Sequence, residues 1–170
     1  MRRRIDRQAS EEFDILVIGG GATGVCVARD AARRGLRVAL VEKGDFAQAT
    51  SAANSKLIHG GLRYLRQFEL GLVRESLQER RIWQRIAPHL VRPLPFLLPL
   101  YDAGWRQRTI LGAGLLLYDL LSLGRAQVEN EDQILPRHHW LDAKEARRCE
   151  PVIARPGLCG AYLYYDCQML

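Results

Sequence analysis

Three glycines and one glutamate carry the clearest chemical signal in this sequence. Gly19, Gly21 and Gly24 have the G-x-G-x-x-G spacing, and Glu42 closes the next apolar run. The first glycine permits a tight turn, the second lets the backbone approach a pyrophosphate, and the third allows a helix to pack close to a strand. A carboxylate at Glu42 can accept hydrogen bonds from ribose hydroxyls. The pattern therefore predicts a site for the pyrophosphate and ribose of a dinucleotide.

The segments on both sides of the glycines are those that a βαβ unit requires. The apolar run 15–18 suits a parallel strand buried on both faces. Residues 22–34 have a helix-forming composition, and Gly35 follows where a helix C′ glycine belongs. Residues 37–42 are expected to form the second strand. The N–H groups at the start of the helix would then face the phosphates. The alternative is a glycine-rich turn that binds no ligand.

Length and composition limit the classes of protein that fit. A chain of 170 residues is long enough for one domain with a core, and no apolar run reaches the ~18 residues of a transmembrane helix. The net charge of +6 suits a nucleic acid, an anionic membrane surface or a phosphorylated substrate, but dispersed arginines on helix faces explain it as well. No basic stripe is interleaved with aromatic residues, so no nucleic-acid partner is expected.

The cysteines and the first residues bear on the compartment. Cys26, Cys149, Cys159 and Cys167 have no common zinc spacing, so no metal site is expected. Cys26 lies among alanines and valines, which predicts a packed position within the first helix. No secretory segment precedes the first strand, which favours a cytoplasmic protein. Residues 1–12 are expected to be a disordered basic tail.

Beyond the nucleotide motif the composition predicts a loop, a helix and an extended segment. The polar stretch 43–55 is expected to be a loop, and residues 69–87 a helix that ends at Pro88. The predicted apolar stripe of this helix comprises Val73, Leu77, Trp83 and Ile86. Its predicted solvent-facing residues are Glu75, Glu79, Arg80 and Arg81. The prolines from 88 to 99 impose an extended path.

Three later segments also have recognisable patterns. Residues 105–123 are the most hydrophobic part of the chain, and they predict either a buried core helix or a surface helix that dips into a bilayer. The arginines that flank this segment are Arg106, Arg108 and Arg125. Residues 142–145 resemble a capping box that opens a short helix ending before Pro151. Residues 158–166 are expected to form a strand.

Longer strings of residues resemble one family. GGGATG is followed by SKLIHGGLRYL at 55–65, and then by the segments LYDLL and YYDCQM. Together they closely resemble the FAD-dependent glycerol-3-phosphate dehydrogenases, from about Phe13 to Leu170. The resemblance implies an α/β fold, a Rossmann-like FAD-binding βαβ unit of the glutathione-reductase/D-amino-acid-oxidase type with additional helices. A glycine triplet with a glutamate permits NAD or FAD, and the resemblance selects FAD.

The resemblance also assigns binding residues. It implies cofactor contacts from Gly19, Gly21, Ala22, Thr23, Gly24, Glu42, Thr50, Ser51, Ser55, Lys56 and Leu57. It places Arg63 and Tyr64 at the substrate, where a guanidinium can grip the oxygens of a small dianion. The alternatives are that Arg63 pairs with a glutamate of the next helix and that Tyr64 is an ordinary half-buried aromatic residue. His59 is either a general base or a brace for the two glycines that follow it, so no catalytic residue is assigned.

The implied reaction is oxidation of sn-glycerol 3-phosphate to dihydroxyacetone phosphate by hydride transfer to flavin N5. In the family the electrons pass to a membrane quinone, or to oxygen in oxidase relatives. The resemblance implies a protein of the cytoplasm that is peripheral on the inner face of the cell membrane. A homo-oligomer is an open expectation.

The chain departs from the family in length. Family members are much longer than 170 residues, so residues 13–170 are expected to be the N-terminal portion of the FAD-binding oxidoreductase domain. An unfinished sheet leaves an open edge and exposed apolar surface. The isolated polypeptide is therefore expected to hold FAD weakly and to have no turnover. A non-catalytic FAD-binding fragment and another FAD-dependent oxidoreductase of the same superfamily remain as alternatives.

Overall fold

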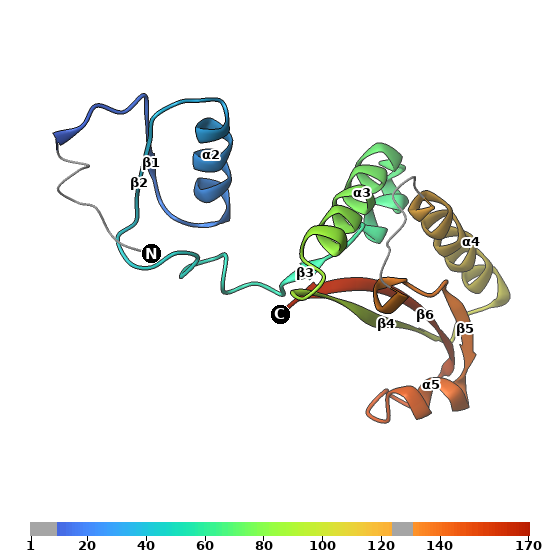
Figure 1. The fold of residues 1–170 in the computed structure, drawn as a ribbon. Coiled ribbons are helices and arrows are strands. Elements are labelled where there is room, and N and C mark those ends of the chain that lie inside the picture. The colour runs from blue at the N-terminus through green and yellow to red at the C-terminus, as the bar shows by residue number, and fades with distance from the viewer. Residues whose placement is uncertain (1–9, 124–130) are drawn as a thin grey trace. The chain divides into compact units, whose positions relative to one another are not determined.

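The computed structural model describes residues 10–123 and 131–170, which fall into two compact units (Figure 1). The N-terminal unit comprises Met1–Ser55 and the C-terminal unit comprises Lys56–Leu170. Most of the predicted basic tail, residues 1–9, and Arg125 lie outside the described residues.

The N-terminal unit is the predicted βαβ unit. It consists of β1 (Ile15–Ile18), α2 (Ala22–Arg33) and β2 (Val38–Val41), and the two strands are parallel. Gly35 has a φ of +85° at the end of α2, and its N–H donates to Ala32 O at 3.1 Å. The next N–H, that of Leu36, donates to Ala31 O at 3.2 Å. This pair of bonds is a Schellman motif, so the predicted C′ glycine is confirmed.

Two predictions about burial in this unit are wrong. Leu16 and Ile18 of β1 are 59% and 82% exposed, because in the described residues no layer covers the second face of the two-stranded sheet. Cys26 was predicted to be packed and is exposed. The buried and half-buried stripe of α2 follows Gly24, Ala28 and Ala31, and Cys26 lies outside this stripe. The unit therefore presents apolar surface to solvent.

The C-terminal unit is built on an antiparallel sheet that was not predicted. Its strands are β3 (Leu57–Ile58), β4 (Val91–Tyr101), β5 (His139–Asp142) and β6 (Leu158–Met169). The central strand β6 pairs with β4 along one edge, and with β3 and β5 along the other. The prediction of a strand at 158–166 is confirmed, and β6 continues to Met169. The extended path predicted for 88–99 is largely β4.

Helices cover both faces of this sheet. Figure 1 shows α3 (Leu70–Ile86) and α4 (Trp105–Ser122) on one side and α5 (Ala143–Cys149) on the other. Two short 3₁₀ helices, η1 (Leu62–Gln67) and η2 (Glu131–Gln133), complete the unit. The main core joins α3, α4 and β6 through Val73, Leu77, Leu115, Tyr118, Tyr162 and Tyr164. A smaller core on the other face contains Leu141, Ala146 and Ala161.

The predicted faces of α3 are partly wrong. Val73 and Leu77 are fully buried, as expected, but Trp83 and Ile86 are exposed. Arg80 was predicted to face solvent, yet its side chain is only 4% exposed. It continues the stripe of Val73 and Leu77 at helical spacing, and Asp166 of β6 supplies an opposite charge there. Helical spacing therefore puts Arg80 on the buried face, and the internal partner Asp166 compensates its charge there.

The hydrophobic helix α4 combines a buried and an exposed apolar face. Leu115 and Tyr118 are buried in the core, whereas Trp105, Ile110 and Leu120 are largely exposed. Among the described helices none has the length and hydropathy needed to cross a membrane. The short helix α5 begins with the predicted capping box: Asp142 Oδ1 accepts from Glu145 N at 2.8 Å, and Glu145 Oε2 accepts from Asp142 N at 2.9 Å.

Replacing Leu77 by alanine tests the core of the C-terminal unit. Leu77 is fully buried between α4 and the sheet. We expect the free energy of unfolding to fall by about 2–5 kcal/mol, because a cavity replaces the lost methyl groups. Urea denaturation followed by circular dichroism measures the change. Leu72→Ala, an exposed position on the same helix, is the control and should stay within about 0.5 kcal/mol of the wild type. Equal effects of both substitutions would contradict this core.

Candidate functional site

The glycine turn of the N-terminal unit has the geometry that a dinucleotide requires. Gly19 has a φ of +107°, and its N–H donates to Val41 O at 2.8 Å, so the turn begins directly where the two strands end. A Cβ atom on Gly24 would lie 1.9 Å from Gly19 O. Only glycine lets α2 start this close to the turn, which places the helix N-terminus at the carboxyl ends of the strands.

The start of α2 is open to an anion. The N-cap residue is Gly21, which offers no side-chain acceptor, and the first turn contains no acidic residue. Ser51 approaches from the loop, and its Oγ accepts the N–H of Ala22 at 2.9 Å. A hydroxyl that accepts one hydrogen bond still has its own O–H to donate. Backbone N–H groups, the helix dipole and the Ser51 hydroxyl thus converge where a phosphate would sit.

Glu42 ties the glycine turn to the end of β2. Its Oε2 accepts the N–H of Gly20 at 2.7 Å, and its Oε1 accepts the N–H of Gly44 at 2.9 Å. The hydrogen bond from Gly20, followed by that from Gly44, lowers the pKa of the Glu42 carboxyl. The side chain is therefore a carboxylate that shapes the turn. Each oxygen has a second lone pair, so a ribose contact from Glu42 stays a prediction.

The other predicted cofactor residues lie on both units. Thr50 and Ser51 belong to a loop that Asn54 closes, since its Nδ2 donates to their carbonyl oxygens at 3.0 and 2.8 Å. Ser55 is the last residue of the N-terminal unit. Lys56, with a φ of +53°, and Leu57 enter the sheet of the C-terminal unit. The structure thus gathers Gly19, Gly21, Ala22, Thr23, Gly24, Glu42 and Ser51 around one turn.

The predicted substrate residues line a hollow of the C-terminal unit. Arg63 Nη2 donates to Tyr64 Oη at 2.8 Å, and the guanidinium carbon lies 4.9 Å from the centroid of that ring. Arg63 thus contacts Tyr64 rather than a glutamate. Arg66 and Gln67 complete the lining of a hollow of about 580 Å³. Arg66 was missed, although the i, i+3 spacing of two arginines in a 3₁₀ turn signals that they share a side.

The two glycines before this hollow serve a close approach to the helices. A Cβ atom on Gly60 would lie 2.2 Å from Leu77 Cδ2 and 2.4 Å from the Tyr118 hydroxyl oxygen. Gly61 has a φ of +72°, and its N–H donates to His59 Nδ1 at 3.1 Å. This bond is the bracing contact that was one of the two alternatives for His59.

A buried polar cluster beneath these glycines was not predicted. The carboxylate of Asp166 accepts from Arg80 Nη1, from the Tyr118 hydroxyl at 2.8 Å and from Gly60 N at 3.1 Å. Burial, followed by the negative charge of Asp166, raises the pKa of Tyr118 far above its ordinary range. Tyr118 is therefore a hydroxyl donor at every physiological pH.

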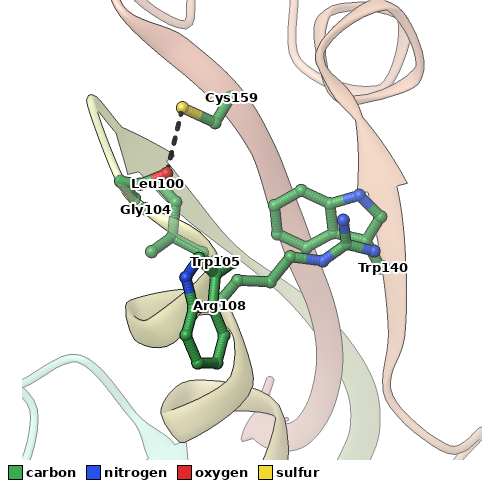
Figure 2. A pocket seen from close by; sticks show the side chains of 7 residues that line it. Leu100, Gly104, Trp105, Arg108, Trp140 and Cys159 are labelled. Atoms are coloured by element: carbon green, nitrogen blue, oxygen red, sulfur yellow. Dashed lines mark hydrogen bonds between the residues drawn. The ribbon is translucent and has the colours of Figure 1, made fainter.

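A second cavity lies at the start of α4, on the C-terminal unit. It has a volume of about 270 Å³, and its lining residues are Leu100, Ala103, Gly104, Trp105, Arg108, Trp140 and Cys159. Figure 2 shows the Arg108 side chain extending to the Trp140 ring, with the guanidinium carbon 4.1 Å from the ring centroid. None of the predicted site residues lines this cavity. The described residues hold no cluster of three or more histidine, cysteine or acidic side chains that could bind a metal ion.

The βαβ unit with its open helix N-terminus defines a dinucleotide-binding protein of the Rossmann-like class. A family profile described as "FAD dependent oxidoreductase" matches residues 14–170. The chain therefore belongs to the FAD-dependent oxidoreductase family.

The chain is also similar to individual proteins over most of its length. The chain is 45% identical over 157 residues to a glycerol-3-phosphate dehydrogenase of Synechocystis sp., covering 92% of this chain and 27% of the relative. It is 47% identical over 162 residues to that of Mycobacterium leprae, covering 95% and 26%. Among solved structures, the glycerol-3-phosphate dehydrogenase from Bacillus halodurans complexed with FAD superposes with a TM-score of 0.62 at 27% identity, covering 97% of this chain and 23% of that one. The chain thus spans about a quarter of the length of these relatives.

The pKa of Glu42 leads to a prediction about acid stability. Because the folded-state pKa is lowered, the stabilisation by the carboxylate is fully present above its unfolded-state pKa and is lost as the pH falls through the lowered value. We expect Glu42→Gln to be less stable than the wild type near neutral pH, and the difference to shrink on acidification. Urea unfolding at a series of pH values measures it. Glu79→Gln, on the exposed side of α3, is the control. A difference independent of pH would contradict the assignment.

Proposed function

We propose that this chain is the N-terminal portion of an FAD-dependent glycerol-3-phosphate dehydrogenase, which oxidises sn-glycerol 3-phosphate to dihydroxyacetone phosphate. The proposal rests on the hollow lined by Arg63, Tyr64, Arg66 and Gln67, called here the arginine hollow, which follows the Gly60–Gly61 turn. The chain that carries this hollow is 45–47% identical to enzymes of that name. Since the chain spans about a quarter of these relatives, the activity is proposed for the complete enzyme. The isolated residues 13–170 are proposed to bind FAD weakly and to have no turnover.

The residues of the glycine turn fit FAD. The first amides of α2 and the Ser51 hydroxyl would hold the pyrophosphate, and Glu42 would face the adenosine ribose. Thr50, Ser55, Lys56 and Leu57 are proposed to contact the pyrophosphate and the flavin. When bound, FAD supplies a two-electron acceptor for the hydride from C2 of the substrate. The chain itself orients both partners and neutralises their phosphates.

The arginine hollow fits a small phosphorylated substrate. Arg63 and Arg66 bring two permanent positive charges to one hollow, and a guanidinium can bind phosphate oxygens in a bidentate manner. The hydrogen bond from Arg63 holds the Tyr64 hydroxyl in place. This hydroxyl is therefore already positioned to bind a substrate oxygen. Because the hollow is lined by these two arginines with Tyr64 and Gln67, it favours a compact dianion over an apolar substrate.

The membrane is the proposed site of electron transfer. The exposed face of α4 carries Trp105, Ile110 and Leu120, and Arg106 lies beside Trp105 at the start of the helix. An apolar face flanked by cations fits an anionic lipid surface, where a quinone would accept the electrons. We therefore propose a peripheral position on the cytoplasmic face of the cell membrane.

Substitution of Gly24 tests the cofactor site. In Gly24→Ala the new Cβ would meet the Gly19 carbonyl oxygen at 1.9 Å, so the start of α2 must move away from the turn. We expect the purified complete enzyme to lose most of its FAD, measured as the ratio of flavin to protein absorbance. Gly114→Ala is the matched control, because a Cβ atom there meets nothing within 4 Å. Full FAD content in Gly24→Ala would argue against this site.

Oxidation of glycerol 3-phosphate by the complete enzyme tests the proposed function. We expect substrate-dependent reduction of a dye with glycerol 3-phosphate and little with unphosphorylated glycerol. Arg63→Ala should lower kcat/KM by about 10–100-fold, the value of one charge-assisted hydrogen bond. Arg74→Ala, an exposed arginine of α3, is the control for loss of charge. An FAD-loaded enzyme that does not oxidise glycerol 3-phosphate would falsify the proposal.

A further inference from the structure

We propose that Asp166, Arg80 and Tyr118 form a positioning cluster, which fixes the Gly60–Gly61 turn and thereby holds Arg63 and Tyr64 at the substrate. The cluster joins β6, α3 and α4 to the turn that precedes η1. The inference rests on the function proposed for the arginine hollow. It adds three buried residues that act on Arg63 and Tyr64 through the Gly60–Gly61 turn.

The cluster is buried and closely hydrogen-bonded. The Asp166 and Arg80 side chains are 2% and 4% exposed and form an ion pair. The Tyr118 hydroxyl donates to both carboxylate oxygens of Asp166, at 3.0 and 2.8 Å. The remaining donor is the backbone N–H of Gly60, at 3.1 Å from Oδ1. One carboxylate thus receives hydrogen bonds from two helices and from one turn.

A short stretch of backbone connects the Asp166 carboxylate to the hollow. Gly60 approaches α3 and α4 so closely that a Cβ atom there would lie 2.2 Å from Leu77 Cδ2 and 2.4 Å from the Tyr118 hydroxyl oxygen. The carbonyl oxygen of Gly61 accepts the N–H of Tyr64 at 2.9 Å, which is the first hydrogen bond of η1. Four chain positions therefore separate the fixed Gly60 amide from Tyr64, and Arg63 lies on the same turn of helix.

Core stability alone does not explain a buried ion pair at this position. A buried ion pair contributes little net stability, and an apolar group of similar size would often serve a core equally well. The surrounding residues Val73, Leu77 and Leu115 form such an apolar core. An apolar residue at position 166, however, would leave the Gly60 N–H buried without an acceptor. The carboxylate supplies the hydrogen-bond acceptor that the Gly60 N–H requires, and an apolar side chain cannot supply it.

Two conservative substitutions in the complete, FAD-loaded enzyme test the proposal. Asp166→Asn keeps the shape but weakens the bonds to Arg80 and Gly60, and Tyr118→Phe removes one donor while it keeps the ring. We expect kcat/KM for glycerol 3-phosphate to fall by about 100-fold in Asp166→Asn and about tenfold in Tyr118→Phe, with unchanged FAD content, because a displaced binding group costs transition-state stabilisation. Arg80→Lys should retain more activity than Arg80→Met, since it keeps the charge.

Gln84→Leu is the matched control for stability. Gln84 is also buried on α3, but its side-chain amide donates to Gln133 O, at 2.8 Å, and not to the turn. Hydrogen exchange of the peptide covering residues 59–64 gives a readout that needs no activity. We expect faster exchange of this peptide in Tyr118→Phe and Asp166→Asn, and wild-type exchange there in Gln84→Leu.

The outcomes separate this proposal from the proposed function. Faster exchange at 59–64 with a loss of kcat/KM confined to the cluster variants supports positioning. Unchanged exchange of residues 59–64 together with unchanged kcat/KM in Tyr118→Phe overturns the proposal. An equal loss of kcat/KM in Gln84→Leu, when its melting temperature matches that of the cluster variants, also overturns it. If Asp166→Asn does not fold, Tyr118→Phe decides. If the wild type does not oxidise glycerol 3-phosphate, the proposed function fails, while the exchange of 59–64 still decides whether the cluster fixes the turn.

Discussion

In the C-terminal unit, a strand, two helices and a turn meet at the buried carboxylate of Asp166. An ionised carboxylate away from water is costly unless charged and hydrogen-bonding groups surround it, and Asp166 has both. The raised pKa values of two neighbouring side chains reflect the low polarity around Asp166. Burial, followed by the charge of Asp166, raises the pKa of Tyr164 to about 12. Burial is also the main cause that raises the pKa of the Cys167 thiol to about 11. Elements that are distant in sequence are thus held together by directional bonds as well as by apolar contact.

The N-terminal unit differs, because its candidate site consists of backbone amides at the glycine turn and at the start of α2. Glu42 and Ser51 do not form a core; they accept N–H groups of the glycine turn and so fix the direction in which the turn faces. A site made of backbone requires close packing rather than particular side chains. The 1.9 Å approach that a Cβ atom on Gly24 would make explains why small residues are needed here. The same few contacts therefore set the fold of the turn and the shape of the candidate site.

The sequence predicted the elements whose signals are local. The glycine spacing, the C′ position of Gly35 and the capping box at Asp142 all depend on residues within one turn of each other, and the structure contains each of these elements. The antiparallel sheet was not predicted because its pairing joins segments that are far apart in sequence. In addition, β4 contains three prolines, which are uncommon in strands. Arg80 was misplaced for the same reason: its partner lies 86 positions later. Arg63 and Tyr64 were assigned to the substrate only through the resemblance, which leaves that role a prediction. Asp166 gave no signal beyond a charge at the end of an apolar run.

The prolines of β4 have a consequence for how this protein meets other chains. Pro93, Pro95 and Pro99 occupy alternate positions of a strand that, in the described residues, pairs with β6 alone. Their missing N–H groups all fall on the outer side, since proline cannot donate to a ladder. A foreign strand would find an incomplete row of donors there, so edge-to-edge aggregation and β-augmentation are disfavoured along this border. Along this border of the described sheet, the prolines themselves limit pairing with another chain.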